Sequence, residues 1–475
     1  MKVLILHFRS APNHDSQELR HRRRASEVDS AGTDGVSLEM MKRRTLLEAM
    51  GHEVSICSAY DWADFPVPAL EFDSEEVMQM MQNLFGPGVV DSASEAELKR
   101  AFHIAFLELK QELGRVITDS APGILFVHNI LSLPVHPVAT VALANLLRET
   151  GLPCAAIHHD VLSEGAYKFT PTCDFAKSIL KKYFPPTMPN LGHWTINSRN
   201  QRSLKKKGIQ ANLIHDTMDF DQTLDVAEQT RIRAALRGKY SIKPNDIVLF
   251  VGSRIVPNKQ IELAGHLAAM LQSLRQEIVG RKLYHGGVFR EESRLVLVLA
   301  GRPERAFGDY RERLFELFDA LGIAWMYVGN EVRPIRWEDE GFYALYPDMY
   351  AMADFVLYPT GWEGFGNQLL EAFAAGLPVA VFEYPVFKED IAPKGVRVVS
   401  LGDTILEKRD LADFAELPAE VISRAAHEMI AIMTTPESYQ SITAHNIMMG
   451  RRYFGFDVLR THLREAINGA DSCGD

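Results

Sequence analysis

With 475 residues, the chain is long enough for two or three domains of ordinary size. Hydrophobic residues make up 47% of it and charged residues 24%, which is the composition of an ordinary globular protein. Its formal net charge of −11 argues against general nucleic-acid binding, which needs a basic surface.

The cysteines and the apolar runs bear on the compartment. Cys57, Cys154, Cys173 and Cys473 show no C-x-x-C spacing, so we expect free thiols in a reducing compartment. Residues 1–7 are too short for a secretion signal, and no apolar run approaches the length of a membrane span. We therefore predict a cytoplasmic protein without a transmembrane segment. A peripheral membrane contact and the oligomeric state stay open.

Short apolar strands alternate with amphipathic helices along the chain, which is the pattern of doubly wound α/β folds. In the first half, strands are expected at residues 3–7, 53–57, 124–127, 154–158, 194–197 and 212–215. The helices expected between them include residues 36–50, 137–149 and 198–207.

The alternation restarts after residues 243–246. Strands are then expected at residues 247–251, 295–299, 324–328, 355–358, 379–382 and 396–399. The sequence therefore predicts two Rossmann-like halves, joined near residues 222–243. A long amphipathic helix is expected over residues 445–467, with an aromatic break at residues 453–456.

A loop with two cations follows the strand at residues 247–251. Gly252 ends the strand, Arg254 and Lys259 lie in the loop, and a helix is expected from about Lys259. Arginine offers a fork for phosphate oxygens and lysine a point charge, so the pair suits a diphosphate leaving group. The alternative is a solvated loop with charges at its rim.

A second glycine-rich turn follows the apolar run at residues 354–358 and leads into a helix expected from about Asn367. Backbone N–H groups at a helix start can donate to an anion, and glycine lets the anion approach closely. Glu363 lies in the turn and Glu371 about one turn into the helix. Phosphate alone would repel these carboxylates, so the turn indicates a ligand with hydroxyls beside its phosphates, such as ribose and a sugar.

The spacing from Glu363 to Glu371, with the glycines after Glu363 and the ending Gly376-Leu-Pro-Val, resembles the E-x7-E motif of retaining GT-B glycosyltransferases. It is most similar to family 4, the glycogen-synthase-like and mannosyltransferase-like group. The loop with Arg254 and Lys259 is similar to the Arg-and-Lys loop of that family. An ordinary βα turn with solvated glutamates is the alternative.

The resemblance covers nearly the whole chain and implies an α/β fold of the GT-B type, with two Rossmann-like domains and an interdomain cleft. Residues 1–222 would form the acceptor-binding domain and residues 243–445 the nucleotide-sugar-binding domain. Residues 446–475 would form a C-terminal helix that crosses back to the first domain.

The function implied is transfer of a sugar from a nucleotide-diphosphate sugar, UDP- or GDP-linked, to an acceptor hydroxyl with retention, without a metal or other cofactor. Arg254 and Lys259 would stabilise the departing diphosphate. Glu363 and His159 would hold the sugar, and Glu371 would hold the ribose. The remaining implied donor contacts are Gly35, Gly252, Gly364, Phe365, Gly366, Asn367, Val328 and Glu331.

Acceptor binding is expected in the first half. The strand end with His128 and Asn129 faces the same way as His159 and could line the acceptor pocket. Arg22 lies in a basic run, residues 20–24, that is either a solvated charge run or a contact for an anionic acceptor or lipid. Residues 31–35 are either the glycine loop of the resembled family or a capped linker.

Some residues depart from the family pattern. The segment from Leu213 to Asp216 stands where Ile-Pro-Asn is usual, and Asn367 replaces a common aliphatic residue. Asp219-Phe-Asp221 has D-x-D spacing but lacks the surroundings of a metal-dependent transferase. Three alternatives remain: a phosphorylase on the same fold, an epimerase-like enzyme that cleaves the nucleotide-sugar, and a non-catalytic nucleotide-sugar-binding protein.

Overall fold

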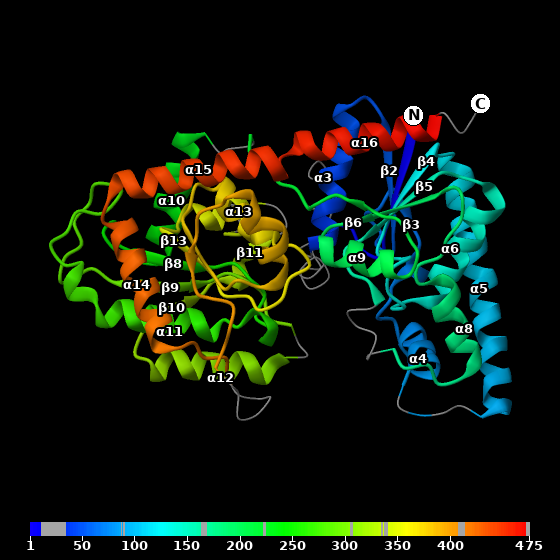
Figure 1. Cartoon of the computed structure of the whole chain (residues 1–475), viewed down its shortest axis with the longest axis horizontal. Coiled ribbons are helices and arrows are strands. Elements are labelled where there is room, and N and C mark those ends of the chain that lie inside the picture. Colours follow the sequence, from blue (N-terminus) through cyan, green and yellow to red (C-terminus); the bar gives the residue numbers. More distant parts are fainter. Residues whose placement is uncertain are drawn as a thin grey trace. The chain divides into compact units, whose positions relative to one another are not determined.

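The computed structural model describes residues 1–10, 35–86, 88, 91–162, 169–221, 225–304, 307–333, 336, 341–406 and 414–471. The chain divides into two compact units. Unit 1 comprises Met1–Asp216 with Asp457–Asp475, and unit 2 comprises Thr217–Phe456. Figure 1 labels many of the elements of both units.

Unit 1 is built on a seven-stranded sheet in the order β3-β2-β1-β4-β5-β6-β7, in which all neighbours pair in parallel. The order reverses between β1 and β4, the point at which doubly wound sheets bind ligands outside the carboxyl ends of their strands. The strands are β1 (Lys2–Leu6), β2 (Glu53–Ser58), β3 (Phe65–Pro66), β4 (Ile124–His128), β5 (Cys154–His158), β6 (Leu191–Thr195) and β7 (Asn212–Leu213).

Helices cover this sheet and close the core of unit 1. Helix α5 precedes β4 and packs against α6, which follows β4. Helix α6 begins with a proline after the His136 N-cap and ends at Gly151 in the left-handed conformation, as start and stop signals predict. The helices are α3 (Gly35–Ala49), α4 (Glu75–Leu84), α5 (Ser92–Ser120), α6 (Pro137–Thr150), α8 (Asp174–Tyr183), α9 (Ser198–Lys206) and α16 (Phe456–Asp471).

Unit 2 repeats the plan with a six-stranded sheet in the order β10-β9-β8-β13-β14-β15, which reverses between β8 and β13. Strands β8 and β9 are apolar and buried at every position, because parallel strands are covered on both faces. The strands are β8 (Ile247–Val251), β9 (Leu295–Leu299), β10 (Ala324–Tyr327), β13 (Phe355–Tyr358), β14 (Val379–Val381) and β15 (Val399–Ser400); β11 (Val332–Arg333) and β12 (Tyr343–Ala344) form a separate pair.

The helices of unit 2 include three that the sequence analysis did not assign, α10, α12 and α14. The segment predicted to join the halves contains α10, which belongs to unit 2. Helix α11 packs on α14, and α13 packs on α15. The helices are α10 (Val226–Lys239), α11 (Glu262–Ser273), α12 (Gly308–Ala320), α13 (Asn367–Ala374), α14 (Ala419–Met433) and α15 (Pro436–Phe454).

The prediction of two Rossmann-like α/β halves is confirmed. The expected helix at residues 445–467 is two helices, α15 and α16, with the predicted aromatic break between them. The division between the units passes through this break, so α16 belongs to unit 1. None of the helices within the described ranges is long and apolar enough to cross a membrane.

Candidate active site

The loops after β8 and β13 meet where the strand order of unit 2 reverses. The Ser253 hydroxyl donates to Gln368 Oε1 on α13 at 2.8 Å, and Gln368 Nε2 donates to the Gly252 carbonyl at 3.0 Å. A Cβ on Gly301, at the end of β9, would lie 1.7 Å from the Ser253 carbonyl oxygen, so only glycine fits there. These contacts fix the loops at the carboxyl edge of the sheet.

Lys259 and Glu363 lie side by side at this edge. Lys259 Nζ forms an ion pair with Glu363 Oε1, and the Tyr358 hydroxyl donates to the same oxygen at 2.8 Å. Burial, with the adjacent carboxylate, raises the pKa of Tyr358, so the hydroxyl keeps its proton and remains a donor. The two residues come from loops 104 positions apart, which the sheet brings together.

Arg254 lies on the same loop as Lys259 but pairs with a different carboxylate. Its side chain is 55% exposed and pairs with Glu304. An exposed ion pair contributes little to stability, so the guanidinium can exchange Glu304 for a phosphate at low cost. Lys259, by contrast, is 5% exposed and held in place by Glu363.

The glycine turn before α13 is held by Tyr384, whose hydroxyl donates to the Phe365 carbonyl at 2.6 Å. Gly366 has φ +136°, and a Cβ there would lie 2.3 Å from the same hydroxyl oxygen. Gly366 is also the N-cap of α13 and supplies no capping side chain, which suits an anion at the helix start. Gly364 lies in this turn. The Phe365 ring is buried 5.4 Å from the Phe454 ring, so its side chain belongs to the core.

Glu371 is buried one turn into α13. Tyr350 and Tyr346 lie close to its carboxylate. Burial first, and then the Glu371 charge, raise the pKa of both hydroxyls, which therefore stay protonated. The site thus has a buried carboxylate next to hydroxyl donors, whereas Glu363 is next to a cation.

Two of the predicted donor contacts, Val328 and Glu331, follow β10; the nucleotide base is the part of the donor that the family resemblance assigns to them. The side chain of Val328 is buried, so the backbone is what this residue can offer a base. The Glu331 carboxylate pairs with Lys239 Nζ at 2.8 Å and accepts a hydrogen bond from the Tyr240 hydroxyl. Both partners come from the end of α10, which sequence reasoning missed.

In unit 1, three histidines connect the ends of β1, β4 and β5. His7 Nδ1 contacts the His128 carbonyl at 2.8 Å, and His128 Nδ1 contacts His159 Nε2 at 3.0 Å. Burial, and then the positive charge of Arg43, lower the pKa of both His128 and His159, which are therefore neutral imidazoles at neutral pH. His159 Nδ1 lies 3.8 Å from Asp216 Oδ1.

Asn129 connects the same strand ends through its side chain. It has φ +56°, and its Oδ1 accepts a hydrogen bond from the His159 amide at 2.9 Å. Its Nδ2 donates to Asp160 Oδ2 at 3.4 Å. The predicted acceptor residues His128 and Asn129 are therefore brought together with His159 where the sheet order of unit 1 reverses.

Sequence reasoning missed a charged cluster on α3. Glu39 pairs with Lys42 Nζ at 2.6 Å and with Arg43 Nη1 at 2.8 Å, and Glu39 and Arg43 are fully buried. The i, i+3 and i, i+4 spacing of these charges was the available signal. Gly35 is the first residue of α3. Arg22 and residues 31–34 lie outside the described residues.

The two carboxylates of the D-x-D pair contact other groups of the protein. Asp219 Oδ1 accepts a hydrogen bond from the Asp221 amide at 2.9 Å, and Asp221 Oδ1 pairs with Arg451 at 2.9 Å. In the part of the chain that the structure describes, no group of three or more His, Cys, Asp or Glu side chains could hold a metal ion.

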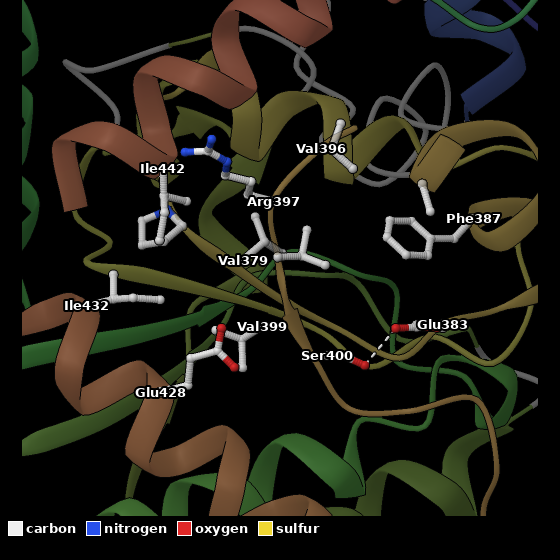
Figure 2. Close-up of a pocket in the computed structure, with 13 residues that line it drawn as sticks. Val379, Glu383, Phe387, Val396, Arg397, Val399, Ser400, Glu428, Ile432 and Ile442 are labelled. Carbon is white, nitrogen blue, oxygen red and sulfur yellow. Dashed lines mark hydrogen bonds between the residues drawn. The ribbon is translucent and has the colours of Figure 1, made fainter. Parts of the chain in front are cut away.

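A pocket of about 410 Å³ lies elsewhere in unit 2, between β14, β15, α14 and α15 (Figure 2). Its lining is mainly apolar, with Val379, Val399, Ile432 and Ile442 among its residues. The Ser400 hydroxyl donates a hydrogen bond to Glu383 Oε1 at 2.6 Å, which is the dashed line in Figure 2. This pocket contains none of the predicted site residues, so we place the candidate site at the strand ends.

Two doubly wound units in one chain, the second with a glycine turn and a Lys–Glu pair at its switch point, define the class of GT-B glycosyltransferases. Solved structures support this fold. The sucrose-phosphate synthase of Thermosynechococcus elongatus aligns with a TM-score of 0.58 at 14% identity, over 100% of both chains. The Anabaena protein HepE in complex with UDP and glucose aligns with a TM-score of 0.52 at 16% identity, over 99% of this chain and 100% of that one.

Sequence comparison gives the family. The model of the family described as "Glycosyl transferases group 1" matches residues 232–400. The mannosylglucosylglycerate synthase of Thermotoga maritima is 32% identical over 441 residues, which is 91% of this chain and 96% of the relative. That of Petrotoga mobilis is 31% identical over 90% of this chain and 97% of the relative. The chain belongs to this family of group 1 glycosyltransferases and is a glycosyltransferase that takes its sugar from a nucleotide-sugar donor.

Proposed function

We propose that this chain is a family 4 glycosyltransferase that transfers a mannosyl group, with retention and without a metal ion, from UDP- or GDP-mannose to a glucosylglycerate acceptor. The two relatives that match most of the chain carry the name mannosylglucosylglycerate synthase, which supports the product class. Buried free thiols, Cys57 and Cys154, support a reducing, cytoplasmic compartment.

The observation that carries the proposal is the contact between Lys259 and Glu363 at the switch point of unit 2. The ammonium group would stabilise charge that grows on the diphosphate as it departs, and Arg254 would add a second cation. Glu363, held by Lys259 and Tyr358, would accept hydrogen bonds from sugar hydroxyls. Glu371 would hold the ribose.

Unit 1 is assigned to the acceptor. His128 and His159 stay neutral at neutral pH. A neutral imidazole has one donor and one acceptor nitrogen, so both side chains can form hydrogen bonds with hydroxyls of the acceptor. His159 would contact the sugar, as the family resemblance implies. The departing phosphate, rather than a protein base, would take the proton of the acceptor hydroxyl.

The test is product analysis with purified protein, glucosylglycerate, and UDP-mannose or GDP-mannose in parallel. The expected product is mannosylglucosylglycerate in which the anomeric configuration of the mannosyl group equals that of the donor. Activity is expected to persist in EDTA, because Arg254 and Lys259 take the place of a divalent ion. Loss of activity in EDTA that manganese or magnesium restores would contradict metal independence.

Two other outcomes would contradict the proposal. Cleavage of a glycoside that requires inorganic phosphate would indicate a phosphorylase. Donor binding without turnover across a broad panel of acceptors would indicate a non-catalytic binding protein.

A further inference from the structure

Arg43 is unusual for an arginine because its side chain is buried. It lies on α3, the helix that follows β1, and its side chain is fully buried. Nη1 donates to Glu39 Oε2 at 2.8 Å and to the Glu39 carbonyl at 3.1 Å. Nε and Nη2, which are also buried, have no hydrogen-bond partner among the described residues. Buried donors without partners are costly, so native structures seldom retain them without a reason.

The two unpaired nitrogens form one edge of the guanidinium. Nε–H and the Nη2–H beside it are the parallel donors with which arginine binds both oxygens of a carboxylate or phosphate. Glu39 occupies only the other side of the group, through Nη1. Lysine could not present such an edge, because its ammonium group is a point charge.

Arg43 lies close to residues that are proposed to bind the acceptor. Its charge acts on His128, His159 and Asp216, which lie at the carboxyl ends of the unit 1 strands. His128 Nε2 is likewise buried with no hydrogen-bond partner among the described residues. Two unpartnered polar groups therefore lie near the point where the sheet order of unit 1 reverses.

The charged groups on α3 carry a net positive charge, which favours an anion beside Arg43. Arg43 and Lys42 carry two positive charges against the carboxylate of Glu39. Burial first, and then the Glu39 charge, raise the pKa of Asp216, so its carboxyl group tends to stay protonated. A further carboxylate near Asp216 is that of Asp160, to which Asn129 donates.

We propose that the Nε–Nη2 edge of Arg43 binds the carboxylate of the acceptor and so selects acceptors that carry one. This rests on the proposed function, in which the acceptor ends in a glycerate group. A phosphate group offers the same oxygens, so the donor diphosphate is the competing ligand, and the experiment separates the two. Because the edge is enclosed, neighbouring groups must move before an acceptor reaches it, and the pair is then strong because water is excluded.

The experiment compares glucosylglycerate with glucosylglycerol, which has the same size but no carboxylate. The wild-type protein is expected to prefer glucosylglycerate in kcat/KM. Arg43→Gln is expected to raise the KM for glucosylglycerate by about tenfold to a hundredfold, the usual effect of losing a hydrogen bond to a charged group. The KM for glucosylglycerol and the Kd for the nucleotide diphosphate are expected to change by less than about twofold.

Arg44→Gln is the matched control. Arg44 is the next residue on the helix but pairs with Glu48 at 2.9 Å and Asp64 at 3.0 Å, so the preference should survive its replacement. Arg43→Lys keeps the charge without the fork and should recover only part of the affinity. If Arg43→Gln fails to fold, Arg43→Lys and the wild-type preference still decide the matter.

Several results would overturn the proposal. One is a wild-type protein that uses both acceptors equally, and another is an Arg43 variant that loses kcat equally with both, as a purely structural residue would. Loss of diphosphate affinity in Arg43→Gln would assign the edge to the donor. If the wild-type protein glycosylates neither acceptor, the proposed function itself fails, which is a different result from transfer without preference.

Discussion

At the scale of single residues, Glu363 and Glu371 differ in their surroundings. Glu363 is held by Lys259 and Tyr358, next to where the leaving group would depart. Its charge should matter more as the anomeric centre becomes positive than before. Glu363→Gln is therefore expected to lower kcat by at least about tenfold, with the Kd for the nucleotide diphosphate nearly unchanged. Steady-state kinetics and calorimetry with the diphosphate measure both.

Glu371→Gln is expected to act on binding instead. Ribose does not change during the reaction, so ground state and transition state lose the same hydrogen bonds. A charged acceptor contributes about 1.5–3 kcal/mol, which predicts a loss of diphosphate affinity of about tenfold to a hundredfold. If Glu363→Gln loses this affinity and Glu371→Gln does not, the two roles are reversed. If neither change matters, the E-x7-E interpretation is wrong.

How much of the site could be predicted depends on where its signal lies in the chain. Arg254, Lys259 and Glu363 stand in loops that follow strands, and Glu371 in the helix after the glycine turn, at spacings that a single sequence displays. The pairing of Lys259 with Glu363 depends on which strands are neighbours, and spacing alone does not give that. Arg43 lies in a helix whose buried face mixes polar and apolar residues, and nothing but an i, i+4 charge pair distinguishes it in the sequence.

At the scale of elements, a buried charge cluster fixes α10 to unit 2. Asp354, just before β13, is fully buried and pairs with Arg233 and Arg237 of α10. It also accepts hydrogen bonds from the Tyr284 hydroxyl at 2.6 Å and the Val248 amide at 2.7 Å. Removing one member of such a cluster leaves charges buried without a partner.

Asp354→Ala is therefore expected to lower the free energy of unfolding of unit 2 by about 3–5 kcal/mol. Asp403→Ala is the control, because Asp403 pairs with Lys388 at the surface and its loss should leave stability nearly unchanged. Urea unfolding of both variants measures the difference. Equal effects of the two substitutions would contradict the role of the cluster.

The same cluster explains why α10 was missed. Its sequence is rich in charged residues and alanine, which is also typical of a linker, and the carboxylate that pairs with its arginines lies more than 110 positions away. The buried strands could be predicted because continuous apolar runs such as β8 and β9 are visible in the sequence. The ends of strands were predicted less accurately: β6 begins three residues before its predicted start, and β15 begins three residues after its predicted start.

At the scale of the whole molecule, two units repeat one plan. Each sheet reverses its order once, and in each unit most candidate residues follow strands at or next to that reversal. In unit 2 these residues are cations and carboxylates, which suit a diphosphate and its sugar. In unit 1 they are neutral histidines and the buried edge of Arg43. This difference supports the assignment of the donor to unit 2 and the acceptor to unit 1.

The histidines should also make the stability of unit 1 depend on pH. His158 Nε2 contacts His193 Nδ1 at 2.9 Å, and burial lowers the pKa of His193 to about 4. Between that value and the ordinary pKa of 6.5, the unfolded chain binds more protons than the folded one. The contribution of His193 is therefore fully present above about pH 6.5 and is lost as the pH falls toward 4.

Urea unfolding, followed by tryptophan fluorescence to which Trp62 and Trp194 of unit 1 contribute, is expected to show this loss between about pH 6.5 and about pH 4. For one histidine the slope approaches about 1.4 kcal/mol per pH unit. The raised pKa of Asp216 opposes it, because a buried carboxyl group becomes less costly as it protonates. His193→Gln keeps a hydrogen-bonding side chain but does not titrate, so it should reduce the slope. It should not abolish the slope, because burial also lowers the pKa of His128, His158 and His159 in the same unit. Replacing the exposed His427 of unit 2 should leave the slope of unit 1 as it is. A slope that is unchanged in His193→Gln would show that this buried pair does not set the acid sensitivity of unit 1.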